Sequence, residues 1–313
     1  APHASSPPRR DGRWRRGLRR DRSLLLMVLP AVGLLALFVY VPLIWTTVAF
    51  KSYDPYVSGL WASPWTGLEN FTLLFHDSRF WDAAVNTLSI TSLQLTLFFP
   101  VPVALALLLN SLLSDRIRAV VQSVLYLPHF FSWVLVITVF QQMLGGAGLI
   151  SQLLRARGHE GFDLMTDPAV FKFLVTAQLV WKDAGWGVIV FLAALSSVNP
   201  ELYEAAAADG AGRLRRMWHI TLPALRPVIA LLLVLRVGDS LTVGFEQILL
   251  QRDAVGPGAS EVFDTYVWWV GLAGGDYGVA AAGGLVKGVF SLVLVLLANK
   301  VAHLLGEQGV YKR

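Results

Sequence analysis

Charged side chains interrupt three of the long apolar stretches of this 313-residue chain. They are Lys182 and Asp183 in one stretch, Arg236 and Asp239 in the next, and Lys287 in the last. A charge at the centre of a membrane helix costs about 2.5–3.5 kcal/mol on insertion scales, so such residues face protein or a watery path rather than lipid. The pattern indicates either ion pairs that hold helices together, such as Arg236 with Asp239, or a polar solute pathway near the midplane.

Neighbouring side chains add to the pathway interpretation without deciding it. Gln178, Glu246 and Gln247 lie close to the charges in sequence. Trp181 and Trp186 flank the Lys-Asp pair, where an indole could stack on a sugar ring, although Trp is also typical of the aromatic belt at a membrane surface. The candidate solute pathway comprises Trp181, Lys182, Asp183, Trp186, Arg236, Asp239, Glu246 and Lys287.

Catalytic and cofactor-binding signatures are missing from the sequence. It has no GxxxxGK[ST] phosphate-binding loop, no cluster with metal-ligand spacing and no nucleophile–base arrangement. The chain contains 0 cysteines, which removes thiolate chemistry and disulfides. His129, beside a proline, is interpreted as an interfacial or packed histidine. We therefore expect no enzymatic activity, no metal site and no cofactor in this chain.

The composition indicates an integral membrane protein. Hydrophobic residues make up 55% of the chain, charged residues only 15%, and the mean hydropathy is +0.57. A soluble domain carries about a quarter charged residues. About six apolar runs approach or exceed the ~20 residues that cross a bilayer, and within lipid such runs must be helical. The expected fold is all-α and polytopic, with spans at 23–50, 83–110, 119–144, 169–195, 224–250 and 277–305.

Basic residues set the expected orientation. The tail 1–22 holds a block of eight arginines just before the first apolar run, a pattern typical of a cytoplasmic flank, with a nucleic-acid-binding arm as the alternative. The first run is too long for a signal peptide and lacks a small-x-small cleavage site, so we interpret it as a membrane helix. The membrane domain, 23–311, then has both termini and the segment 196–224 in the cytoplasm.

The cytoplasmic segment carries strong helix signals. Asn199 suits an N-cap, Pro200 suits the first helical position, and the alanines that follow are the best helix formers. Gly210 can end the helix in the left-handed conformation. A second short helix is expected at about 213–219, running into Pro223. A merely solvated connecting loop is the alternative, but it leaves the capping and the alanine face unexplained.

This segment resembles a known signature. Glu204-Ala205-Ala206, then Gly210, then Ile220-x-Leu222-Pro223, is similar to the "EAA" motif of permease subunits of bacterial binding-protein-dependent ABC importers. The stretches 127–133, 244–247 and 264–267 resemble the carbohydrate branch, most of all permeases for oligosaccharides derived from pectin or alginate. The resemblance extends over nearly all of 23–311.

The resemblance implies a type I ABC importer permease fold in the bacterial inner membrane. The helix around Glu204 would be a coupling helix seated in a cleft of one of two ATPase subunits, which bind ATP and magnesium. A second homologous permease would complete the pore, and an extracytoplasmic binding protein would deliver the oligosaccharide. The implied coupling residues are Glu204, Ala205, Ala206, Asp209, Gly210, Ile220, Leu222 and Pro223.

Three alternatives remain open at this stage. The importer could carry another polar solute, such as a peptide or a phosphorylated polyol. The chain could instead be a stand-alone secondary transporter in which the midplane charges form an ion relay. A structural or assembly role in the membrane is the third hypothesis. Membrane lipid is an expected partner in every case, and nucleic acid is not.

Overall fold

The computed structural model describes residues 22–57, 59–112, 114–159 and 162–304. Regular structure within these ranges is helical, apart from one isolated antiparallel bridge between Lys51 and Trp65. The Arg-rich tail predicted at 1–22 lies almost wholly outside the described residues. The fold class predicted from the sequence is confirmed.

Six helices of the described chain are long and apolar enough to cross a membrane, as predicted. Several are composite, because 3₁₀ or π turns interrupt the α-helix without ending it. The spans are Arg22–Phe50 (α2, η1, α3, η2), Ser78–Asn110 (α5, η3, α6), Trp133–Arg155 (α8, α9), Phe171–Ser196 (α10), Arg213–Gly238 (α12, η5, α13) and Tyr277–Leu304 (α18).

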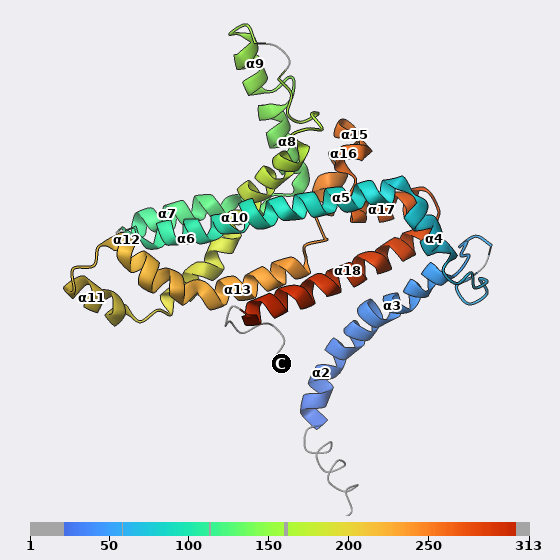
Figure 1. Cartoon of the computed structure of the whole chain (residues 1–313), viewed down its shortest axis with the longest axis horizontal. Helices are drawn as coiled ribbons and strands as arrows, with labels where there is room; N and C mark the ends of the chain where they lie inside the picture. The colour runs from blue at the N-terminus through green and yellow to red at the C-terminus, as the bar shows by residue number, and fades with distance from the viewer. Residues whose placement is uncertain (1–21, 58, 113, 160–161, 305–313) are drawn as a thin grey trace, which may run out of the picture.

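The bundle is elongated, with most spans running along its long axis (Figure 1). Helix α10 packs against α6, and α18 packs against η2 and α13. Helix α11 (Pro200–Ala208) stands at one end of the molecule, and α4 (Glu69–His76) and α17 (Phe263–Trp268) lie at the other. Two arms, α2–α3 and α8–α9, leave the bundle on opposite sides (Figure 1).

The predicted third span, 119–144, is wrong in its boundaries. Helix α7 (Asp115–Tyr126) ends in a 3₁₀ turn, η4 (Leu127–Phe130), and a new helix begins at Trp133. Pro128 contributes no backbone N–H to continue α7, and the Ser132 hydroxyl accepts from the Leu135 N–H at 3.3 Å, which starts α8. The candidate span therefore runs from α8 across a short non-helical turn at 145–148 into α9.

The predicted fifth span, 224–250, is also displaced. Arg213 begins a helix that continues through Pro223 to Gly238, so the separate short helix expected at 213–219 is the first part of this span. A π turn, η5 (Met217–Thr221), shifts the backbone hydrogen-bond register just before the proline, which lets the helix accommodate it. Asp239 is the C-cap residue, so it lies at the end of the span rather than near its middle.

The segment 251–276, although polar in sequence, is largely folded into the bundle. It contains α15 (Arg252–Val255), α16 (Pro257–Ser260), α17 and η6 (Trp269–Ala273). Glu261 is only 3% exposed and pairs with Arg252 at 2.6 Å, and the Arg252 guanidinium also lies 4.3 Å from the Trp269 ring centroid. Because Arg252 and Glu261 neutralise each other, the polar segment can be buried, and its helices α16 and α17 pack against α5.

Asp77 anchors the same end of the bundle. Its carboxylate accepts from the Tyr266 hydroxyl at 3.0 Å and pairs with Arg79 at 2.9 Å. Burial alone would raise the pKa of Asp77, but hydrogen bonds from Arg79 and Tyr266 outweigh it and hold that pKa below its ordinary value. Burial, reinforced by the hydrogen bond to Asp77, raises the pKa of the Tyr266 hydroxyl.

Three buried glutamines join α10 to α14 (Phe245–Leu249) and the turn that follows it. Gln247 Nε2 donates to Gln178 Oε1 at 2.7 Å, and Gln178 and Gln251 exchange hydrogen bonds at 3.0 Å. Each of these side chains is no more than 2% exposed. Such a network stabilises a fold only when every member is satisfied.

We expect Gln178→Leu to lower the free energy of unfolding by about 1–3 kcal/mol, because it removes the hydrogen bonds that Gln178 makes with the buried amides of Gln247 and Gln251. The shift in thermal unfolding midpoint of the detergent-purified protein measures the effect. Gln142→Leu is the matched control, since Gln142 is exposed on α8. Equal midpoints for both variants would show that the network carries no stability.

Candidate functional site

Helix α11 forms as its sequence signals predict. The Asn199 side chain accepts from the Glu201 N–H at 3.0 Å, Pro200 starts the helix, and Gly210 adopts φ +78° just beyond its end. The Ala211 N–H then bonds back to the Ala206 carbonyl at 2.9 Å and satisfies the last turn. The helix stands clear of the bundle at one end of the molecule (Figure 1).

The predicted coupling residues fall into two groups. Glu204, Ala205, Asp209 and Gly210 are exposed and Ala206 is half-buried. The other group, Ile220, Leu222 and Pro223, is half-buried at the start of the fifth span.

The two groups are physically linked. The Tyr203 hydroxyl lies 3.1 Å from Thr221 Oγ1, between α11 and the span. This contact joins the helix that carries the first group to the span that carries the second.

The charges of α10 form a compact cluster with a residue from η4. Lys182 Nζ donates to the His129 carbonyl at 2.6 Å, and Asp183 Oδ1 lies 2.9 Å from His129 Nδ1 and 3.7 Å from Lys182 Nζ. The His129 ring stacks on Trp186 at 4.6 Å with an interplanar angle of 11°. The sequence indicated only an interfacial or packed role for His129. Its contact with α10 depends on the turn η4, which follows the end of α7, and this turn was not predicted.

The other candidate pathway residues do not join this cluster. Arg236 donates to Gln94 Oε1 at 2.8 Å and lies 5.3 Å from the Phe98 ring centroid; among the described ion pairs it has none with Asp239. The Arg236–Asp239 ion pair, one of the alternatives left open by the sequence, is therefore not among those described. Trp181 packs against Phe140 and is 39% exposed.

Lys287 makes a separate ion pair with Asp264 of α17 and donates to Thr242 Oγ1 at 3.1 Å. Sequence spacing alone could not identify Thr242 and Asp264 as partners of Lys287. Both reach α18 only through the way the chain folds after α13. Glu246 is exposed. The polar residues of the bundle thus occupy several places along it.

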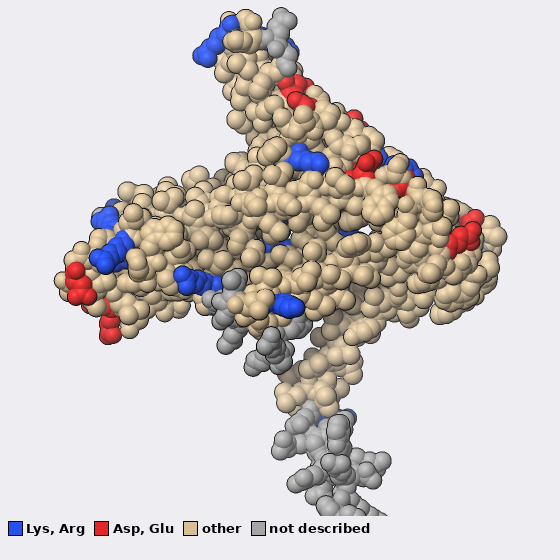
Figure 2. Space-filling view, viewed as in Figure 1, with Lys and Arg blue, Asp and Glu red and all other residues tan. Residues whose placement is uncertain are grey.

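Charge is distributed toward the ends of the molecule. Figure 2 shows a long middle face with few charged side chains, while basic groups gather near α12 (Arg213–Arg216) and acidic groups lie at the α11 end and at the opposite end. Within the described ranges, no group of three His, Asp or Glu residues could hold a metal ion.

Comparison with known proteins identifies the family. Residues 97–306 match the family described as binding-protein-dependent transport system inner membrane component. The chain is 43% identical, over 94% of its own length and 92% of the relative's, to the polygalacturonan/rhamnogalacturonan transport system permease protein YteP of Bacillus subtilis (strain 168). It is 31% identical, over 78% of each chain, to the arabinooligosaccharides transport system permease protein AraP of the same organism.

Solved structures agree with this similarity. A crystal structure of a bacterial ABC transporter involved in the import of the acidic polysaccharide alginate superposes with a TM-score of 0.86 at 37% identity, covering 93% of this chain and 98% of that chain. A second structure, of the alginate ABC transporter with a pentasaccharide-bound periplasmic protein, gives a TM-score of 0.86 over 94% and 99% of the two chains.

The chain therefore belongs to the inner-membrane components of binding-protein-dependent ABC importers. Within that family it falls in the carbohydrate branch, beside the polygalacturonan and alginate permeases. It is a multi-pass permease subunit and not itself an enzyme, and ATP is bound by a separate subunit of such systems. The stand-alone secondary transporter and the structural protein are thereby set aside.

Proposed function

We propose that the chain lines the translocation path of an importer for acidic oligosaccharides. The observation that carries this is the 37% identity, over 93% of the chain, to a transporter of an acidic polysaccharide. Three cationic side chains inside the bundle support it: Lys182, Arg236 and Lys287. Cations in a low-dielectric bundle attract uronate carboxylates, and guanidinium and ammonium groups supply hydrogen-bond donors to them.

Helix α11 is the proposed contact with one of two ATPase subunits. Its exposed small side chains permit close approach of a partner groove, and Tyr203 ties it to the fifth span. Closure of the ATPases on ATP would then move α11 and switch the bundle between inward- and outward-facing states. In this role α11 and both termini would lie in the cytoplasm, with the fifth span entering the membrane after Arg213.

A second, homologous permease is the proposed partner within the membrane. The arms α2–α3 and α8–α9 leave the bundle on opposite sides, and their apolar side chains, such as Phe38 and Leu153, are more than half exposed. On α18 an added Cβ at Gly284 or Gly288 would meet nothing within 4 Å, so this small-residue row is open to a neighbouring helix.

Reconstitution of the complete transporter with its binding protein tests the proposed solute. Stimulated ATP turnover is measured with oligogalacturonides, alginate oligosaccharides and neutral oligosaccharides of matched length. We expect stimulation by an acidic series and little by its neutral counterpart. Stimulation by neutral sugars alone would contradict the acidic-solute proposal while leaving the importer role intact.

Lys287→Met is expected to weaken transport of acidic oligosaccharides by about tenfold or more, because it removes a cation and leaves the Asp264 carboxylate without its ion-pair partner. Initial rates of uptake for acidic and neutral substrates give the comparison. Lys300→Met is the control, since Lys300 is exposed on the same helix. An equal loss for acidic and neutral substrates would mean that Lys287 and Asp264 only hold α18 to α17.

A further inference from the structure

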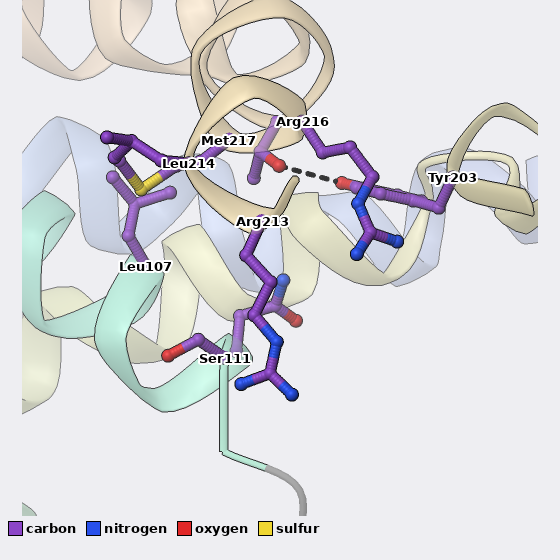
Figure 3. A pocket seen from close by; sticks show the side chains of 9 residues that line it. Leu107, Ser111, Tyr203, Arg213, Leu214, Arg216 and Met217 are labelled. Carbon is purple, nitrogen blue, oxygen red and sulfur yellow. Dashed lines mark hydrogen bonds between the residues drawn. The ribbon is translucent and has the colours of Figure 1, made fainter. Parts of the chain in front are cut away.

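A pocket of about 450 Å³ lies at the α11 end of the bundle, where two spans meet the short helix. Its walls come from the end of α6 (Pro100–Asn110), from α11 and from the first turns of the fifth span. Figure 3 shows the labelled residues around it and the hydrogen bond between the Tyr203 and Thr221 hydroxyls. The lining residues are Leu107, Asn110, Ser111, Tyr203, Arg213, Leu214, Arg216, Met217 and Thr221.

The pocket has cationic side chains and no carboxylate among its lining residues. The guanidinium groups of Arg213 and Arg216 extend to the same side, one beside Ser111 and the other beside Tyr203 (Figure 3). Arg216 Nε is buried and has no hydrogen-bond partner among the described residues. A buried, unpaired donor of this kind is costly unless a ligand satisfies it, and two guanidinium groups match the oxygens of a phosphate.

The opposite wall of the pocket is apolar. It lies at the α11 end of the bundle, where α6 ends and the fifth span begins. Leu107, Leu214 and Met217 gather there (Figure 3), and Leu214 is 66% exposed. One residue past Met217, Trp218 is 57% exposed, and Trp is a residue type enriched at membrane–water interfaces. A ligand with both an anionic group and an apolar part fits these two walls better than a small free anion does.

We propose that this pocket binds the phosphate of an anionic phospholipid. The two arginines hold the phosphate oxygens, Asn110 and Ser111 lie beside the headgroup, and the acyl chain leaves along the wall formed by Leu107, Leu214 and Met217. The site spans α6, α11 and the fifth span, so the bound lipid braces α11 against the bundle. The inference rests on the pocket and is independent of which solute is carried.

Native mass spectrometry of the purified full-length protein tests this binding. The protein is titrated separately with phosphatidylglycerol, phosphatidylcholine and inorganic phosphate. The double variant Arg213→Gln/Arg216→Gln should bind phosphatidylglycerol at least about tenfold more weakly, since each basic side chain near a membrane surface contributes to anionic-lipid affinity. Arg215→Gln is the matched control, because Arg215 is the neighbouring arginine and does not line this pocket.

Several outcomes would overturn the proposal. Unchanged phosphatidylglycerol affinity in the double variant is one, and equal affinity of the wild type for phosphatidylcholine is another. Displacement of phosphatidylglycerol by equimolar inorganic phosphate would indicate a free-anion site instead. Loss of the lipid adduct when the ATPase subunits bind would assign the arginines to a protein interface. If the double variant is not recovered folded, the lysine pair Arg213→Lys/Arg216→Lys must retain the preference for phosphatidylglycerol, and loss of that preference counts against the proposal.

Discussion

Replacing Glu204 with lysine is expected to abolish solute-stimulated ATP hydrolysis while the protein still inserts and assembles. Glu204 is exposed in the middle of α11, so the change disturbs no packing in this chain. If α11 seats in a groove of the ATPase, the reversed charge enters a desolvated contact. Removing one partner of a buried charge pair at an interface costs about 2–5 kcal/mol of binding free energy. A loss of this size is enough to lower coupled ATP turnover by well over tenfold.

The assay compares ATP turnover with and without loaded binding protein in the reconstituted complex. Glu201→Lys is the matched control, because it makes the same charge reversal on the same helix one turn earlier, outside the EAA motif. We expect the control to keep most of its stimulation. Full stimulation in the Glu204 variant would remove α11 from the coupling route.

Gly185→Ala is expected to cost more stability than any other single-methyl change that we propose. A Cβ at Gly185 of α10 would lie 2.0 Å from the Leu125 carbonyl oxygen and 2.5 Å from its carbon. These are backbone atoms of α7, so no side chain can rotate away, and the two helices must separate. Overpacking costs about 1–3 kcal/mol where side chains can adjust, and we expect more here.

The recovered yield and the thermal unfolding midpoint in detergent measure this effect. Gly33→Ala is the control, since Gly33 also lies in a membrane span and an added Cβ there meets nothing within 4 Å. The contact matters beyond stability, because η4, which follows α7 directly, supplies the His129 carbonyl that accepts from Lys182 of α10. A wild-type midpoint in Gly185→Ala would show that α7 and α10 do not pack as described.

The helical fold and the number of spans could be predicted from the sequence, because lipid permits so few backbone structures. Helix α11 was equally predictable, since Asn199, Pro200 and Gly210 each act locally on the backbone. Helix boundaries at prolines were not predictable in this way. A helix ends before Pro128, whereas a helix continues through Pro223. A π turn, η5, precedes Pro223, and no local sequence pattern predicts it.

The partners of the buried charges could not be predicted either. Sequence spacing offered Asp239, three residues along the chain, as one possible partner of Arg236, but Gln94, 142 positions away, accepts its hydrogen bond. Likewise Lys287 pairs with Asp264, which lies in a polar segment outside the long apolar runs. Such pairs depend on tertiary packing, and sequence spacing reports only neighbours within one helix.

The most direct test of the account is the sidedness of α11. The chain has 0 native cysteines, so Ala207→Cys provides a single thiol on an exposed face of the helix. A membrane-impermeant maleimide is applied to intact spheroplasts and to inside-out vesicles. A cytoplasmic α11 should be labelled only in inside-out vesicles, and less once the ATPase subunits are bound. Labelling of Cys at this position in intact spheroplasts would contradict it.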